Sequence, residues 1–70
     1  MQLINVEYQV YYYREKRDLT VRQLAELSGV SKTEINDIEN GKKHPTVPIL
    51  YKISLALEVP FGDLFTVEIT

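Results

Sequence analysis

Cysteine is absent from this 70-residue chain. The chain therefore cannot form disulfides, thiolate metal sites or a thiol nucleophile, and its stability must come from packing and helix capping. Long apolar runs are absent too, and residues 1–10 lack the basic-then-apolar order of a signal peptide. We therefore expect a soluble, cytoplasmic protein that is not associated with a membrane.

An excess of positive charge is also missing. The chain has eight basic and ten acidic residues, which give a formal net charge of -2. Proteins that bind nucleic acid through their overall charge are strongly basic, so the composition argues against that mode of binding. A polyanionic partner needs only one positive face, however, so the distribution of charge is more informative than the total.

The sequence contains no repeat and no low-complexity run, so residues 1–70 are expected to form one domain. The lone histidine, His44, has no second histidine or nucleophile placed near it by any motif, which favours a solvated loop position. Glu34, Asp37 and Glu39 lack the loop spacing of a divalent-metal site. We therefore expect a protein that is not an enzyme and that needs no cofactor or metal.

Apolar spacing predicts a first helix that follows Asn5 and ends near Arg17. Asn5 is a favourable N-cap residue. Val6, Val10 and Tyr13 then recur at intervals of three to four residues, which is typical of one face of a helix.

Two capping boxes predict two further short helices. In a capping box, the first residue and the residue three positions later each satisfy a free backbone N–H of the other. The pairs are Thr20 with Gln23 and Ser31 with Glu34. Each predicted helix ends at a glycine, Gly29 or Gly41, because helix ends often require a positive φ that other residues resist.

The remaining sequence predicts a basic loop, a longer helix and a closing turn. Residues 42–45 end in proline and are expected to form the loop, and Thr46 can cap the helix that follows. A last helical turn is expected at residues 61–65. The tail, residues 66–70, alternates in polarity but is too short to predict a structure and is open to fraying. The expected fold is all-α, with five helices.

The stretch LTVRQLAELSGVSKTEINDIENG, residues 19–41, resembles the helix-turn-helix of the phage-repressor type, also called the XRE or Cro/cI-like family. The residues that carry the resemblance are Ala25 at the helix crossing, Gly29 in the turn, and the apolar Val30, Ile35 and Ile38. The later stretch LALEVPFGDLF is similar to the family's closing helices. The resemblance covers about residues 10–65 and implies a compact, repressor-like DNA-binding domain with its motif at about residues 20–40.

The resemblance also implies which residues contact DNA. If Ile35 and Ile38 anchor the second helix of the motif, the opposite side of that helix must point outward. In the family this is the recognition helix, which lies in the major groove. The implied contacts with base edges come from Lys32, Thr33, Asn36 and Asp37. The implied contacts with phosphate come from Thr20, Arg22, Asn40, Lys42 and Lys43.

A further implied interaction is a structural salt bridge between Arg14 and Glu39, which would fix the first helix against the recognition helix. Two positions depart from the family pattern. Val21 replaces a glutamine that usually hydrogen-bonds a phosphate. Glu58 replaces the glycine that usually ends the fourth helix.

Two carboxylates, Glu34 and Asp37, occupy the supposed groove face. A carboxylate approaches DNA only at a cost unless it accepts a hydrogen bond from a base such as cytosine. Two functions therefore stay open. One is a sequence-specific transcriptional regulator, a repressor that binds double-stranded DNA as a homodimer through the surface around Leu64 and Phe65. The other is a protein-interaction or antitoxin-like module that uses the same fold with weak or no DNA binding.

Overall fold

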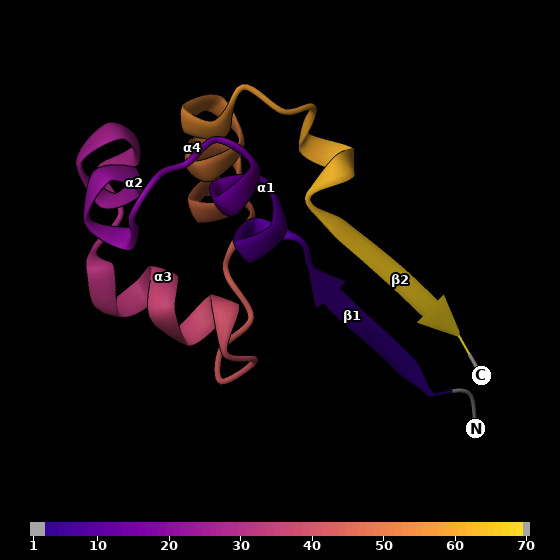
Figure 1. The fold of residues 1–70 in the computed structure, drawn as a ribbon. Coiled ribbons are helices and arrows are strands. Elements are labelled where there is room, and N and C mark those ends of the chain that lie inside the picture. The colour runs from indigo at the N-terminus through magenta and orange to yellow at the C-terminus, as the bar shows by residue number, and fades with distance from the viewer. Residues whose placement is uncertain (1–2, 70) are drawn as a thin grey trace.

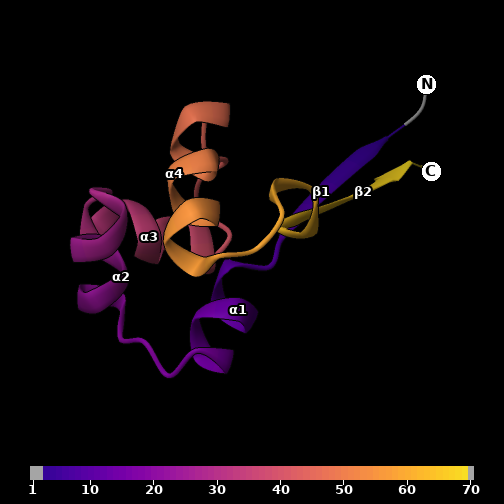
Figure 2. The ribbon, with the colours of Figure 1, turned by 90° about the horizontal axis from the view of Figure 1, so that it is seen from above.

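The computed structural model describes residues 3–69, in which the helices gather into one body and the two strands extend from it side by side (Figures 1 and 2). The elements in chain order are β1 (Ile4–Tyr8), α1 (Val10–Lys16), α2 (Val21–Ser28), α3 (Lys32–Glu39), α4 (Val47–Leu57), the 3-10 turn η1 (Phe61–Asp63) and β2 (Phe65–Ile69). None of the helices in this described part is long and apolar enough to cross a membrane.

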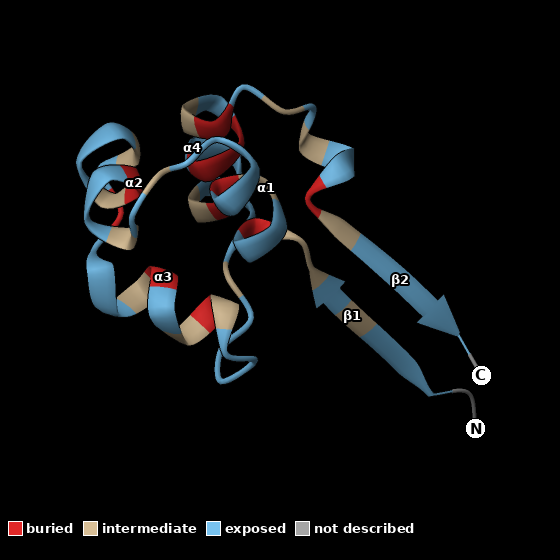
Figure 3. Cartoon of the chain, viewed as in Figure 1, coloured by how far each residue is buried: buried red, intermediate tan, exposed pale blue. Residues whose placement is uncertain are grey.

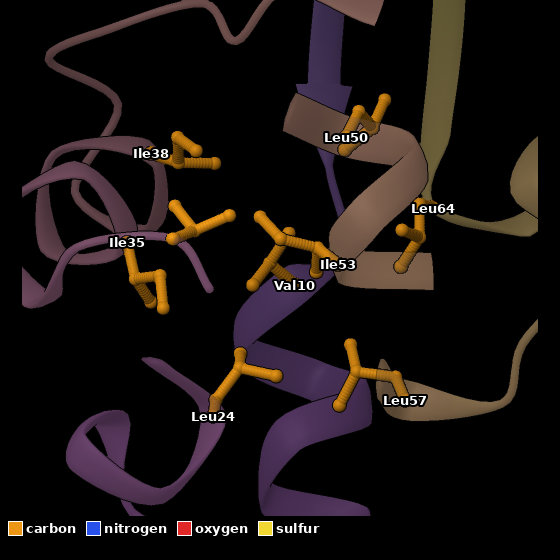
Figure 4. Close-up of a cluster of buried hydrophobic side chains, with 9 residues drawn as sticks. Val10, Leu24, Ile35, Ile38, Leu50, Ile53, Leu57 and Leu64 are labelled. Atoms are coloured by element: carbon orange, nitrogen blue, oxygen red, sulfur yellow. The ribbon is translucent and has the colours of Figure 1, made fainter. Parts of the chain in front are cut away.

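The helices share one apolar core, to which every helix contributes at least one buried side chain (Figures 3 and 4). The core consists of Val10, Leu24, Val30, Ile35, Ile38, Leu50, Ile53, Leu57 and Leu64. Figure 4 shows Ile35 and Ile38 reaching from α3 toward Val10 and Ile53. One side of α3 is thereby fixed to the body, which leaves its other side to solvent.

The two predicted capping boxes differ in the structure. The first is complete, because the N–H of Gln23 donates to Thr20 Oγ1 at 3.0 Å and the N–H of Thr20 donates to Gln23 Oε1 at 2.8 Å. In the second, the N–H of Glu34 donates to Ser31 Oγ at 3.1 Å, but the Glu34 carboxylate accepts from the ammonium of Lys43. The reciprocal half of this box was predicted wrongly, because the carboxylate pairs with a charged donor instead.

Glycines end α2 and α3 in the predicted way. Gly29 and Gly41 have φ angles of 75° and 72°. At the end of α3, the N–H of Gly41 donates to the carbonyl of Ile38 and the N–H of Lys42 donates to the carbonyl of Asp37, at 3.2 and 2.9 Å. This Schellman arrangement fixes the basic loop to the end of α3.

Helix α4 ends in a left-handed residue although no glycine is present there. Glu58 has a φ of 56°. Its carboxylate accepts a hydrogen bond from Arg17 Nη1 at 3.1 Å, and both side chains are largely exposed. The strained cap therefore has only a weak compensating ion pair.

The prediction of an all-α, five-helix fold is wrong at both ends of the described chain. Residues 4–8 form β1, and α1 begins only at Val10, so Asn5 is not its N-cap. In place of the expected fifth helix, the structure has the single 3-10 turn η1. Strand β2 occupies most of the tail, for which the sequence predicted no structure. Thr70 lies outside the described residues. The fold is mostly helical with a small two-stranded sheet.

The strand pairing explains why residues 4–8 do not join α1. β1 and β2 are antiparallel, with Ile4 opposite Ile69, Val6 opposite Val67 and Tyr8 opposite Phe65. Alternate residues of a strand share a face, so these six side chains form one apolar sheet face. The other face carries Asn5, Glu7, Thr66 and Glu68. Pairing with a segment some 60 residues away in the sequence thus overrides the local helical spacing.

Candidate nucleic-acid interface

The outward side of α3 carries three of the four residues predicted to contact base edges. Lys32, Thr33 and Asn36 are exposed, whereas Ile35 and Ile38 are buried on the opposite side (Figure 3). A helix held in this way offers a row of polar side chains along one side, with its apolar side committed to the core. This is the shape that a major groove accepts.

The fourth predicted residue, Asp37, lies beside this row and is only partly exposed. The other acidic residue, Glu34, is also partly enclosed, with a side chain that is 18% exposed. Glu34 Oε1 accepts from Lys43 Nζ at 3.1 Å, while Glu34 Oε2 is buried and has no hydrogen-bond partner within residues 3–69. Lys43 therefore neutralises much of the negative charge that the sequence places at the start of α3.

The start of α2 holds the two predicted phosphate contacts that precede the turn. The Thr20 Oγ1 atom accepts the cap hydrogen bond from Gln23, but its hydroxyl hydrogen can still be donated. Arg22 is highly exposed and pairs with Glu26 on the next turn, with 3.4 Å between Arg22 Nε and Glu26 Oε1. An exposed pair of this kind is weak, so the guanidinium can exchange this partner for a phosphate at little cost.

The loop after α3 holds the remaining predicted phosphate contacts, Asn40, Lys42 and Lys43, and all three are exposed. The loop is also tied to β1, because the Tyr8 hydroxyl lies 3.0 Å from His44 Nδ1 and the two rings meet edge to face. His44 is exposed and lies in a loop, as expected, and it is in addition paired with Tyr8. No local pattern could have shown this, since the two residues are 36 positions apart.

Arg14 and Glu39 form the ion pair that the family resemblance implies. Arg14 Nε donates to Glu39 Oε2 at 2.7 Å and Nη2 donates to Oε1 at 3.0 Å, with both side chains at most 10% exposed. Hydrogen bonding to the Glu39 carboxylate raises the pKa of Arg14 above its usual value. Arg14 Nη1 also donates to the Leu19 carbonyl at 2.7 Å. One guanidinium therefore joins α1, the segment before α2, and the end of α3.

The described residues contain no group of three or more histidine, aspartate or glutamate side chains that could hold a metal ion.

Comparisons with known proteins agree with this geometry. The sequence model of the HTH_3 family, described as helix-turn-helix, matches residues 10–64 and so excludes both strands. The HTH-type transcriptional repressor RghR of Bacillus subtilis is 48% identical over 52 residues, which are 73% of this chain and 38% of that protein. The HTH-type transcriptional regulator SlrR of the same organism is 42% identical over 57 residues, which are 80% of this chain and 38% of that protein.

A solved structure is similar in fold as well as in sequence. An HTH_3 family transcriptional regulator from Vibrio cholerae has a TM-score of 0.74 and 39% identity, over 77% of this chain and 30% of that chain. This chain therefore spans about a third of the length of these relatives.

Proposed function

Since the chain belongs to the HTH_3 family of helix-turn-helix transcriptional regulators, we propose that it binds double-stranded DNA sequence-specifically, as a homodimer, and represses transcription. The observation that best supports this proposal is the exposed polar row of Lys32, Thr33 and Asn36 on a helix whose opposite side is buried. The name of one relative, a transcriptional repressor, supports the repressor role.

Each side chain of the row suits a different base edge in the major groove. An asparagine such as Asn36 can bond both N6 and N7 of adenine, and a lysine such as Lys32 can donate to O6 and N7 of guanine. Thr33 can contact the methyl group of thymine or a polar edge. Asp37, at the margin of the row, can accept from cytosine N4.

Contacts with phosphate would come from both flanks of α3. On one side, Thr20 and Arg22 stand at the start of α2, where the first N–H groups of a helix have no partner within the helix and favour anions. On the other side, Asn40, Lys42 and Lys43 lie in the exposed loop. Such contacts position the protein on any duplex, whereas the α3 row selects the sequence.

A homodimer follows from the size of the recognition helix. α3 has eight residues and can read only a few base pairs. Two copies related by a two-fold axis would place two such helices in successive major grooves, about 34 Å apart. This arrangement doubles the sequence that is read and predicts an inverted repeat as the operator.

The alternative is a protein-interaction module, which the acidic Glu34 and Asp37 would favour. The ion pair of Glu34 with Lys43 weakens that argument, because one of the two charges is already compensated. The remaining acidic residue, Asp37, shares the outward side of α3 with Lys32, whose positive charge balances its negative charge.

Binding of labelled duplexes, measured at several salt concentrations, separates the two functions. A DNA-binding protein should lose affinity steeply as salt rises, because bound phosphates release counterions. Lys32→Ala should weaken binding, whereas Lys52→Ala, which removes the same charge from an exposed position on α4, should not. Absence of salt-sensitive duplex binding would contradict the proposal and favour the interaction module.

A further inference from the structure

An apolar groove lies between the sheet and the start of α4. Its walls include Val6 and Val67 from the apolar sheet face, Val47 and Leu50 from α4, and Phe61 from η1, around a hollow of about 220 Å³. In Figure 2 the two strands diverge from the first turns of α4, so that the sheet and the helix form the two sides of a V.

Apolar residues of the groove, and of the sheet face and helix that continue from it, are exposed to an unusual degree. The exposed fractions are 66% for Ile4, 68% for Val47, 54% for Val67 and 58% for Ile69. Tyr51, one turn after Val47, is also exposed. Clustered exposed apolar side chains of this kind are typical of an interaction site, whereas single exposed apolar residues are ordinary. A two-stranded sheet is also marginally stable unless its apolar face is covered.

We propose that a second copy of this chain covers this groove, with the apolar sheet face of each copy packed into the groove of the other. This inference rests on the proposed function, in which a two-fold pair binds DNA. Leu64, which the sequence placed at the pairing surface, is fully buried and cannot take part, whereas Phe65 belongs to the apolar sheet face.

The charge distribution selects a second copy over DNA or a charged partner. The paired positions of the apolar sheet face carry no charged residue, and its Ile–Ile and Val–Val pairs suit an interface in which the same patch meets itself. The charged residues of the strands, Glu7 and Glu68, lie on the opposite face, where they would repel both phosphate and a second acidic sheet.

The position of the groove is compatible with two recognition helices on one duplex. The sheet projects from one end of a molecule that measures 41 × 22 × 20 Å, whereas α3 lies within the helical body (Figures 1 and 2). A two-fold axis beside the sheet leaves the outward side of both α3 helices free. Half-sites about 34 Å apart require each helix to lie about 17 Å from the axis, which the length of the molecule allows.

Sedimentation of the whole chain without DNA tests the interface. The wild type should sediment as a dimer of a chain of 8.1 kDa. Val67→Glu places a charge on the apolar sheet face and should weaken self-association by about 100-fold or more, because two unpaired carboxylates would be buried. Thr66→Lys, which adds a charge one residue away on the other face and opposite Glu7, should leave the dimer intact. A monomeric wild type at about 100 µM, or equal self-association of the two variants, would overturn the proposal.

A second variant distinguishes loss of the interface from unfolding of the sheet. Val47→Glu alters the other wall of the groove, at the first residue of α4, where a negative charge suits the helix N-terminus. It should also give a folded monomer, with helical circular dichroism equal to that of the wild type. A folded Val47→Glu variant that remains as dimeric as the wild type would count against the interface.

Duplex binding separates failure of this interface from failure of the proposed function. If the wild type dimerises through the groove but binds no duplex, the proposed interface stands and the proposed function is wrong. If the wild type and its Val67→Glu variant are both monomeric and bind duplex equally tightly, DNA binding stands, whereas the proposed interface is wrong.

Discussion

Arg14 donates two hydrogen bonds to the Glu39 carboxylate, and both side chains are almost completely enclosed. Because a third bond from Arg14 reaches the Leu19 carbonyl, the guanidinium connects the segment before α2 with the end of α3. The pair therefore sets the position of α3 from its inner side, away from the exposed row of Lys32, Thr33 and Asn36. Removal of one partner leaves a buried charge unpaired, which costs far more than removal of both.

Arg14→Met alone should lower the free energy of unfolding by about 3 kcal/mol, because it leaves the Glu39 carboxylate buried without its partner. Arg14→Met combined with Glu39→Leu should be less destabilising than this single change. Chemical denaturation of the wild type, both single variants and the double variant measures the coupling. Losses that simply add would show that the two side chains do not depend on each other.

Glu58→Gly should raise the free energy of unfolding by roughly 0.5–1 kcal/mol, because glycine adopts the observed φ of 56° without a Cβ clash. The exposed ion pair with Arg17 is lost, but such pairs contribute little. Glu58→Ala is the matched control, since it loses the same ion pair and keeps the Cβ. Thermal melts in which the glycine and alanine variants are equally stable would show that the left-handed cap carries no strain.

Glu34→Gln should tighten binding to every duplex by about three- to tenfold, because it releases Lys43 from its ion pair and removes a negative charge beside DNA. Lys43→Ala should weaken binding to all duplexes to a similar extent. The dependence of its affinity on salt concentration should be shallower by about one charge. Titrations at several salt concentrations measure both. An unchanged salt dependence in Lys43→Ala would remove Lys43 from the interface.

Asp37→Asn should tighten non-specific binding while it reduces discrimination at one base pair by roughly 1–3 kcal/mol. The aspartate repels the phosphates of every sequence, and only a cytosine N4 donor at the correct position offsets that repulsion. Competition between the preferred site and its single-base variants measures the change. If specific and non-specific affinities both stay the same, Asp37 does not face DNA.

The sequence predicted the helix-turn-helix well because its signals are local. The cap of Thr20, the left-handed Gly29 and the apolar spacing of Ile35 and Ile38 lie within a few residues of the structures that they determine. The pairing of Arg14 with Glu39 is not local, and it was expected only because the chain resembles a known family.

The sheet and the Tyr8–His44 pair could not be predicted in the same way. Ile4, Val6 and Tyr8 do alternate with polar residues, but Val6 also fits the helical spacing of Val10 and Tyr13. Each strand is only five residues long, and its partner lies at the other end of the sequence. Neither strand gives an unambiguous signal until the pairing itself is known.

Selection of binding sites from a pool of random duplexes tests the central claim most directly, because it examines DNA binding, sequence preference and two-fold symmetry together. The account predicts enrichment of an inverted repeat whose half-sites are centred about 34 Å apart. The same selection with Asn36→Ala should lose the preference at one position of each half-site while the spacing stays unchanged. Failure to enrich any sequence would contradict the assignment of α3 as a recognition helix. Enrichment of the same sites by the wild type, Asn36→Ala and Lys32→Ala would contradict it as well.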